Sequence, residues 1–348
     1  MNRIIIADIC SANNKGKSSG HYFSVAQNYI EMFGEDFNIY VAGGPVYKQD
    51  FYNTHMELPY DHIVGESSFI EKWHELINCW HLFRHTKGDI IIFQSVSLIT
   101  TYIAILLFYY GGNKLFFIQY YSESINSKLK KSLWTLIQKR VNGIICSSDR
   151  VGKSFGIPYQ VVTDYVYTKK ETMQALSFRD RKYDLCLVGG IFRDKGQVEA
   201  LRAFRGKGLK VLIAGKANEE GLEQEIAQII KEDSNIEAHI GYVSYDDYYR
   251  YIRQSKYCVL NYSGTYNDRS SGVVLDIIFN NTPVLGHKCG ALQLIADNGL
   301  GYIYDSLDKI DFNTLFSPDK YDVYCKNISN YLSKQKEYII ELKTFLQI

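Results

Sequence analysis

Residues 183–204 read YDLCLVGGIFRDKGQVEALRAF, and this stretch decides the fold that the sequence predicts. It begins with a continuously apolar run, passes through Gly189, Gly190 and a charged loop, and ends in a helical pattern. A strand without alternating polar residues is buried on both faces, which is typical of parallel strands covered by helices. We therefore expect a strand, a glycine turn and a helix, the repeating unit of an α/β sheet.

Similar apolar runs recur along the chain, separated by longer helical patterns. The first half contains RIIIAD, FNIYVAG, DIIIFQS, KLFFIQY and NGIICSS, and the second half adds KVLIAG, EAHIGY, YCVLNY, TPVLGH and LGYIYD. Strands that alternate with helices at this spacing predict βαβ units and doubly wound sheets. A charged interval, residues 167–182, separates the two series and is interpreted as a linker. The simplest architecture is two Rossmann-like domains facing a cleft, in which ligands bind beyond the carboxyl ends of the strands.

Composition excludes several classes of function. The chain has 348 residues, enough for about two domains, and a net charge of +1 gives no argument for a nucleic-acid partner. Seven cysteines, none in a C-x-x-C pair, lie mostly in apolar runs, as reduced thiols of a cytoplasmic protein do. No signal peptide opens the chain, and the apolar stretch 98–110 is too short to span a bilayer, so we expect a buried helix there.

The loop after the strand at 183–188 carries two cations, Arg193 and Lys195, just before Gly196 and a helix. A flexible backbone, two positive charges and a helix N-terminus suit an anion, most simply a phosphate. The alternative is a turn whose charges are solvated.

A second candidate site lies in NDRSSGVVLDIIF, residues 267–279. Ser270 or Ser271 is a natural N-cap, and the free amides of the first turn would bind an anion. Asp276 stands one to two turns inside this apolar helix, where it could accept hydrogen bonds from a diol, and Asp268 could bind further hydroxyls. The alternative is that Asp276 is a structural acid paired inside the core.

The loop after the first strand, NNKGKSSGH at residues 13–21, contains GKS but lacks the earlier glycine of a phosphate-binding P-loop, since position 11 is Ser11. Gly16 and Gly20 would allow close approach of a ligand, and a plain surface loop is the alternative. Gln94 and Gln119 stand at the ends of two further strands.

The C-terminal half resembles retaining GT-B glycosyltransferases, the group that includes sucrose synthases and bacterial capsule and lipopolysaccharide transferases. The resemblance rests on strand–glycine–Lys195–Gly196–helix, then Asp268 and Asp276 with seven residues between them, then N-x-P-V, a glycine loop and G-x-G-Y, and it is specific over residues 183–305. It is weaker over residues 1–165. It implies an N-terminal acceptor-side domain at 1–166, the linker at 167–182, a donor domain at 183–320 and a C-terminal helix at 321–348 that packs back toward the N-terminal domain.

The same resemblance implies roles for individual residues. Lys195 would bind the donor diphosphate with Arg193, Asp276 the nucleotide ribose, and Asp268 the donor sugar. The donor pocket would be lined by Gly189, Gly190, Ser270, Ser271, Gly272, Val273, Asp276 and Gly290. The N-terminal cleft loops would contribute Gly16, Gly20, His21, Gln94 and Gln119.

The implied function is transfer of a sugar from a nucleotide sugar to a glycan or lipid-linked acceptor, with retention of anomeric configuration and no cofactor, as in bacterial polysaccharide biosynthesis. Both acids are usually Glu in this family, and the usual N-terminal histidine is absent here. Those departures favour one alternative, a nucleotide-sugar-binding subunit with weakened catalysis. A nucleotide-sugar epimerase of the same fold is a lesser alternative.

Two further expectations follow from the residues themselves. No Asp-x-Asp pair occurs, so the sequence predicts no metal site. Residues 127–140, SKLKKSLWTLIQKR, are basic with interleaved apolar residues, so they could lie on an anionic membrane surface, with a solvated helix face as the alternative.

Overall fold

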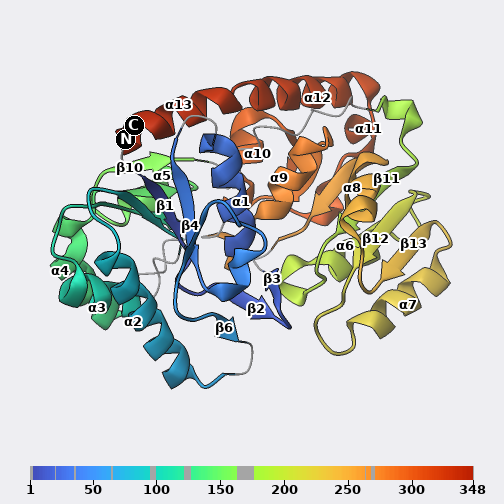
Figure 1. The fold of residues 1–348 in the computed structure, drawn as a ribbon. Coiled ribbons are helices and arrows are strands. Elements are labelled where there is room, and N and C mark those ends of the chain that lie inside the picture. Colours follow the sequence, from blue (N-terminus) through green and yellow to red (C-terminus); the bar gives the residue numbers. More distant parts are fainter. Residues whose placement is uncertain are drawn as a thin grey trace. The chain divides into compact units, whose positions relative to one another are not determined.

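The computed structural model describes residues 3–19, 21–34, 37–63, 66–94, 99–120, 127–162, 176–262, 264–267 and 271–347. The chain divides into two units (Figure 1). The N-terminal unit is Met1–Lys169 together with Gln335–Ile348, and the C-terminal unit is Lys170–Lys334.

The N-terminal unit is built on a parallel sheet in the order β10-β9-β8-β7-β1-β4-β5. Its strands are β1 (Ile4–Ala7), β4 (Ile39–Gly43), β5 (His55–Glu57), β7 (Ile90–Phe93), β8 (Lys114–Gln119), β9 (Gly143–Cys146) and β10 (Tyr159–Val161). The five strands expected from apolar runs are confirmed. The sequence missed β5 and β10, because each is a three-residue edge strand without an apolar run.

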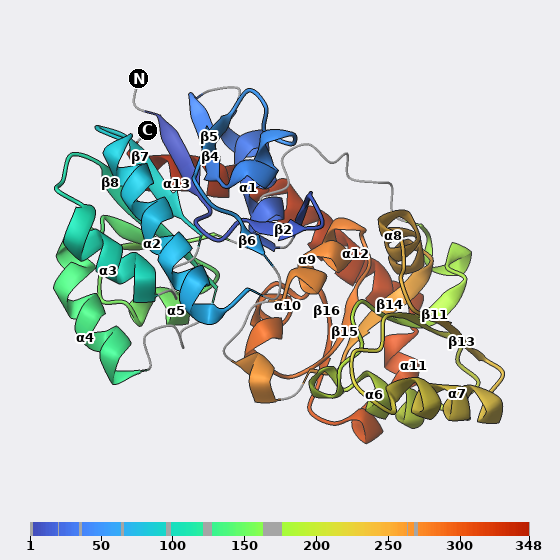
Figure 2. The same cartoon turned by 60° about the horizontal axis from the view of Figure 1, so that its bottom comes forward.

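Helices cover both faces of this sheet. They are α1 (His21–Phe33), α2 (Ser68–Arg84), α3 (Ile99–Phe108), α4 (Lys128–Ile137), α5 (Asp149–Lys153) and α13 (Gln335–Leu346). On one face of the sheet, Leu82 of α2 and Tyr102 of α3 share a core with Ile91 of β7. On the other face, Val25 of α1 and Leu342 of α13 share a core with the strand residues whose side chains point the opposite way. Figure 2 shows α2, α3 and α4 together on one side of the sheet, and α2 contacts α3 while α3 contacts α4.

Helix α3 is the buried helix expected at 98–110. In the part of the chain that the structure describes, no helix is long and apolar enough to cross a membrane.

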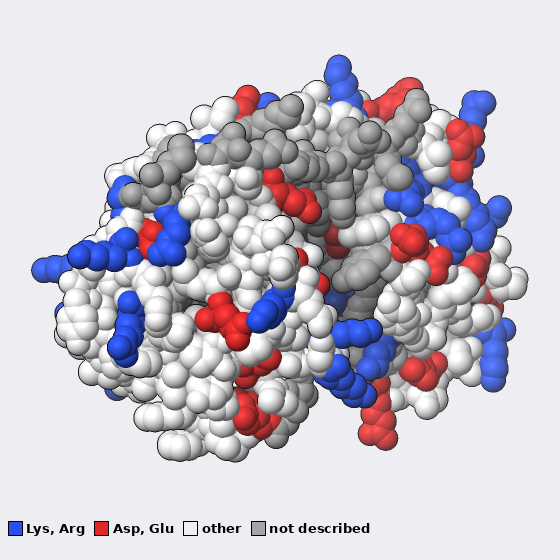
Figure 3. Space-filling model, viewed as in Figure 1, with Lys and Arg blue, Asp and Glu red and all other residues white. Residues whose placement is uncertain are grey.

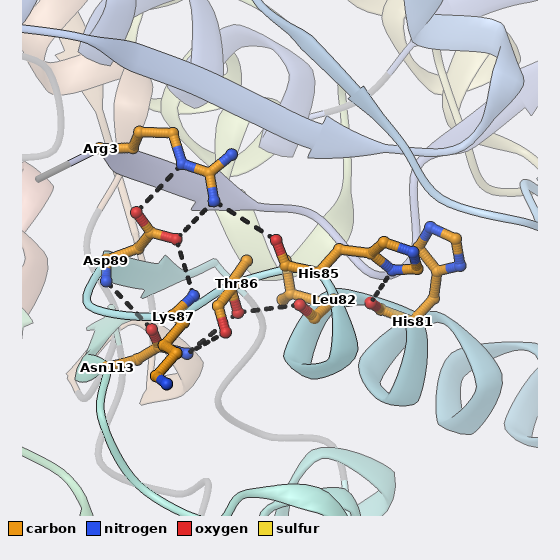
Figure 4. Close-up of polar contacts among 8 residues, drawn as sticks. All are labelled: Arg3, His81, Leu82, His85, Thr86, Lys87, Asp89 and Asn113. Atoms are coloured by element: carbon orange, nitrogen blue, oxygen red, sulfur yellow. Dashed lines mark hydrogen bonds and ion pairs between the residues drawn. The ribbon is translucent and has the colours of Figure 1, made fainter.

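A polar network fixes the C-terminal end of α2 to the sheet (Figure 4). Arg3, before β1, donates two hydrogen bonds to the Asp89 carboxylate, at 3.0 and 2.7 Å, and one to the carbonyl oxygen of His85. The Asn113 amide donates to Thr86 at 2.9 Å and accepts from the backbone N–H of Asp89. The end of α2 is therefore held between β1, β7 and the turn before β8.

The C-terminal unit has a parallel sheet in the order β13-β12-β11-β14-β15-β16. Its strands are β11 (Tyr183–Val188), β12 (Val211–Gly215), β13 (Ile236–Ile240), β14 (Ser255–Leu260), β15 (Val284–His287) and β16 (Gly301–Tyr304). All six expected strands are confirmed. This is the Rossmann order 3-2-1-4-5-6, in which the chain reverses direction across the sheet between β11 and β14.

The helices of this unit are α6 (Gln197–Phe204), α7 (Leu222–Glu232), α8 (Tyr245–Arg253), α9 (Gly272–Phe279), α10 (Gln293–Asn298), α11 (Phe312–Leu315) and α12 (Pro318–Ser333). The expected C-terminal helix is two helices, α12 in the C-terminal unit and α13 in the N-terminal unit. Phe345 of α13 packs its ring edge against Phe116 of β8. The fold class expected from the sequence, two Rossmann-like α/β domains, is confirmed.

Two segments differ from the sequence interpretation. The loop expected at 13–21 contains a hairpin of β2 (Ala12–Asn14) and β3 (Lys17–Ser19), closed by Lys15 and Gly16, which both have positive φ. The part of the expected linker that is described, 176–182, is anchored to the C-terminal unit. The buried Arg181 guanidinium donates there to the carbonyl oxygens of Asn281 and Ser255.

Candidate functional site

The switch point of the C-terminal sheet brings together the loop after β11 and the start of α9. Gly189 has φ +93°, and a Cβ atom there would lie 3.8 Å from the Cγ2 atom of Val273, in the first turn of α9. The candidate residues at 189–196 and at 271–276 therefore lie at the same edge of the sheet. This is where open α/β sheets bind ligands.

Lys195 ends the short helical turn η5 (Arg193–Lys195) and is half-buried. Its ammonium donates to the carbonyl oxygen of Gly190 at 2.9 Å and lies 5.1 Å from the ring centre of Phe192. Burial lowers the pKa of Lys195, and the nearby Asp194 carboxylate opposes that shift. Among the described residues, no carboxylate forms an ion pair with Lys195. An anionic ligand would compensate the cost of burying this cation.

Gly196 joins this turn to α6 in the left-handed region, at φ +61°. Its carbonyl oxygen accepts a hydrogen bond from the Asn261 amide at 2.9 Å, and the Tyr304 hydroxyl donates to the other end of that amide. A Cβ atom at Gly196 would lie 2.3 Å from the carbonyl oxygen of Asn261. Only glycine fits here, and the contact holds Lys195 beside the end of β14.

Arg193 points toward α7 and its preceding loop. Its guanidinium pairs with Glu225 at 2.8 Å and with Glu219 at 3.6 Å. The hydrogen bond that Arg193 donates to the Glu225 carboxylate is the main cause of the raised pKa of Arg193. Because two carboxylates already balance Arg193, the arrangement favours Lys195 as the cation that receives an anion.

Among the described residues, no side chain caps the first turn of α9. Ser271 occupies the N-cap position, but its hydroxyl shares a 2.7 Å hydrogen bond with the Tyr262 hydroxyl instead of capping the helix. The backbone N–H groups of Gly272 and Val273 therefore have neither an intrahelical acceptor nor a cap from Ser271. Asp268 and Ser270, two other expected site residues, lie outside the described residues.

Asp276 is half-buried on α9 and contacts α8. The Tyr248 hydroxyl donates to its Oδ2 atom at 3.1 Å. Burial and then the Asp276 carboxylate raise the pKa of Tyr248, so this hydroxyl stays protonated and remains a donor. The acid inside this apolar helix thus has a protein partner that orients it, and that partner was not identified from the sequence.

Gly290 starts the turn η7 (Gly290–Leu292) and has a packing role. A Cβ atom at Gly290 would lie 1.9 Å from the carbonyl oxygen of Asn267, in the turn η6 (Gly264–Asn267). Because glycine has no side chain, η6, the turn that leads toward α9, can pack closely against the loop after β15.

The N-terminal sheet has its own switch point, between β1 and β7, and Gln94 stands there directly after β7. Its side chain is 2% exposed, and among the described residues neither its amide nitrogen nor its amide oxygen has a hydrogen-bond partner. An orphaned buried amide costs free energy, which a polar ligand would recover.

The positions of the other expected N-terminal residues give less support for a binding site. Gln119 ends β8 and is buried. Gly16 turns the β2–β3 hairpin, and a Cβ atom there would meet nothing within 4 Å. His21 begins α1, and Gly20 lies outside the described residues.

Asp8, which follows β1 at the same switch point, was not singled out from the sequence. Its buried carboxylate accepts hydrogen bonds from the Tyr47 hydroxyl and from the backbone N–H of Cys10. Burial raises the pKa of Asp8 to about 6, against the opposing effect of the Tyr47 hydrogen bond. The signal for it was present: an acid directly after the first buried strand.

No group of three His, Cys, Asp or Glu side chains that could hold a metal ion occurs among the described residues. The expectation of no metal stays a prediction.

Comparison with known proteins identifies the fold. Residues 168–316 match the family described as glycosyl transferases group 1, which is less than half of the chain. No curated protein matches. Anabaena HepE, solved in complex with UDP and glucose, aligns over 100% of both chains at 10% identity with a TM-score of 0.66. The α,α-trehalose 6-phosphate synthase of Burkholderia multivorans aligns over 99% of this chain and 96% of its own, at 11% identity and a TM-score of 0.66. The N-terminal domain of Candida albicans trehalose-6-phosphate phosphatase aligns over 100% and 97%, at 11% identity and a TM-score of 0.68. The chain thus has the two-domain GT-B fold, and its residues 168–316 are similar to group 1 glycosyl transferases.

Proposed function

We propose that this protein is a glycosyltransferase that moves a sugar from a nucleotide-diphosphate sugar to a glycan or lipid-linked acceptor. The observation that carries the proposal is the half-buried Lys195 ammonium at the sheet switch point, bonded to a carbonyl oxygen rather than to an acid. The family match over residues 168–316 and the UDP-bound structural neighbour support it.

In the proposed reaction, the protein acts mainly through electrostatics. The bond between the sugar's anomeric carbon and the diphosphate breaks, and negative charge grows on the departing phosphate. Lys195 and the amides of Gly272 and Val273 stabilise that charge, because they are fixed before the reaction begins. The acceptor hydroxyl attacks the anomeric carbon from the face that the phosphate leaves, so configuration is retained, and its proton passes to an oxygen of the departing diphosphate. This scheme needs neither a cofactor nor a metal ion.

Donor recognition is divided between two acids. We assign Asp276 to the ribose hydroxyls, oriented by the hydrogen bond from Tyr248. Asp268 is assigned to the donor sugar on the family pattern alone. Arg193 is kept as a secondary contact, since Glu225 and Glu219 balance its charge.

The acceptor is assigned to the N-terminal unit. Gln94 offers a buried donor and acceptor that lack partners among the described residues, which suits a sugar hydroxyl. Gln119 ends the neighbouring strand β8.

We also propose that α4 attracts the protein to an anionic membrane surface at the cytoplasmic face, in keeping with a lipid-linked acceptor of polysaccharide biosynthesis. Lys128, Lys131, Lys139 and Arg140 of the basic segment 127–140 are exposed, and Leu129 and Leu136 lie among them. Lys128→Glu with Lys131→Glu should weaken sedimentation with anionic liposomes. Binding that is absent at low salt for the unaltered protein would leave α4 a solvated helix.

A thermal-shift screen with nucleoside diphosphates and their sugars tests donor recognition. A ligand that binds the folded state stabilises it by mass action, by about 2.7 kcal/mol when the free ligand concentration is a hundred times the dissociation constant. The melting temperature rises accordingly. We expect a shift with at least one nucleotide and a smaller shift in Lys195→Ala. Lys309→Ala, at an exposed lysine distant in sequence from this loop, is the matched control. No shift with any nucleotide or nucleotide sugar would contradict the proposal.

A further inference from the structure

The outer face of α2 carries large aromatic side chains in the open. Phe69 is 81% exposed, Trp73 56% and Trp80 41%. Spacings of four and seven residues place these three side chains on one face of the helix. The chain has three tryptophans, and the third, Trp134, is buried in the core. Exposed aromatic residues collected on one helix indicate a surface that contacts something apolar.

The charged residues that are fully exposed around this face are cations. The exposed residues from 67 to 87 are apolar, hydroxylic, histidine or cationic, and the cations are Lys72, Arg84 and Lys87. The Arg84 guanidinium lies 5.2 Å from the ring centre of Trp80. The two acids of α2 are paired: Glu75 is buried and pairs with Lys72, and the half-buried Glu71 pairs with His62.

The same pattern continues over the neighbouring helices. Helix α2 contacts α3, and α3 contacts α4. Large apolar side chains are exposed on both, at Leu107 and Tyr110 near the end of α3 and at Leu129 and Leu136 on α4. Across the described residues 66–94, 99–120 and 127–140, no carboxylate side chain is exposed. Figure 3 shows mostly uncharged surface over α2 at the lower left, with basic side chains beyond it on the left.

Helix α2 is held rigidly enough to present this face. Ser67 caps its start by accepting from the Ile70 N–H, and the network of Figure 4 fixes its end. Between them, the buried Asn78 amide donates to the carbonyl oxygens of Ile9 and Tyr60. The aromatic residues therefore belong to a packed helix and not to a loop.

We propose that the face formed by α2, α3 and α4 docks on an anionic lipid bilayer, with Phe69, Trp73 and Trp80 seated among the headgroups. Tryptophan and phenylalanine suit the bilayer interface, and surrounding lysine and arginine attract anionic lipids. A second copy of this chain on the same face is disfavoured, because a symmetric contact would bring the cations together.

The proposal rests on the membrane attraction assigned to α4 and extends it to α2, but the aromatic contact of α2 is tested separately from that attraction. Attraction of lysines by anionic headgroups weakens with salt, since counter-ions screen it within about 8 Å at physiological ionic strength. Burial of aromatic surface does not weaken in this way. The proposal therefore predicts that part of the binding persists at high salt and depends on α2.

The test uses the full-length protein and vesicles that contain phosphatidylglycerol and phosphatidylcholine. Phe69→Ser with Trp73→Ser should lower vesicle affinity roughly tenfold, because the apolar area of these two side chains is no longer buried in the membrane. Both residues are exposed, so the fold should survive. Tyr52→Ser is the matched control, because Tyr52 is 79% exposed and follows Phe51, which belongs to the core on the opposite face of the sheet.

A second readout reports the contact directly. Brominated phospholipids should quench the tryptophan emission of the unaltered protein, and Trp73→Phe with Trp80→Phe should remove the quenching while Trp134 still emits. Vesicle binding of the Phe69→Ser, Trp73→Ser variant equal to that of the unaltered protein, or emission that brominated lipid leaves unchanged, would overturn the proposal. A dimer that Trp73→Ser dissociates, without vesicle binding, would assign the face to a second copy instead.

Discussion

Replacing Asp276 by asparagine separates a ligand-binding acid from a structural one. The Tyr248 hydroxyl donates to Asp276 at 3.1 Å, and the side-chain oxygen of asparagine can accept the same bond. We therefore expect the free energy of unfolding to change by no more than about 1 kcal/mol, since no cavity forms and the Tyr248 hydroxyl keeps an acceptor. The nucleotide ribose would lose a charged acceptor, which is worth about 1.5–3 kcal/mol. Nucleoside diphosphate affinity should fall about tenfold or more.

Calorimetric titration and thermal unfolding of the same samples measure both quantities. Tyr248→Phe keeps the charge of Asp276 but removes its orienting donor, so it should weaken binding less than Asp276→Asn does. Asp322→Asn, at an exposed acid on α12 beyond its first turn, is the control and should change neither quantity. Equal nucleotide affinity in the unaltered protein and in Asp276→Asn would refute the ribose role. A loss of several kcal/mol of stability with unchanged affinity would make Asp276 a structural acid.

Four further outcomes are expected. Transfer in excess EDTA should match transfer with magnesium, and activity that collapses until magnesium is restored would contradict the metal-free scheme. Nucleoside diphosphate affinity should fall as pH rises through the lowered pKa of Lys195, which lies below 10.5, because the ammonium loses its charge; titrations across this range should show no such fall in Lys195→Met. The pKa of Asp8 is about 6 in the folded protein against an ordinary value of 3.8, so folding favours its protonated form. The stability that this proton contributes, at most about 3 kcal/mol, should therefore be lost as pH rises through 6. Thermal unfolding of Asp8→Asn should lack this loss. Gln94→Leu should leave stability unchanged or higher, since it removes a buried amide that has no partner among the described residues, while transfer slows; equal transfer rates would show that Gln94 does not contact the acceptor.

The sequence predicted the central strands because burial on both faces leaves a continuous apolar run. It missed β5 and β10, whose three residues are half-exposed at sheet edges. The β2–β3 hairpin was taken for a loop, because its polar strands carry no alternation and the turn residues Lys15 and Gly16 resemble any flexible segment.

The candidate site could be located from residues that break a local pattern, such as a lysine before a glycine or an acid in an apolar helix. Their partners could not be located in this way. Tyr248 meets Asp276 because α8 packs beside α9, and Asn261 meets Gly196 because β14 lies next to β11. Such contacts depend on which elements become neighbours, and no local spacing encodes them.

Release of nucleoside diphosphate from a panel of nucleotide sugars tests the central claim most directly. The unaltered protein should release diphosphate from one donor, faster when a suitable acceptor is present, and Lys195→Ala should release it at least about tenfold more slowly, since a charged contact to the leaving phosphate is lost. Tight donor binding without any release would show a nucleotide-sugar-binding protein, and that result would contradict the proposed transfer.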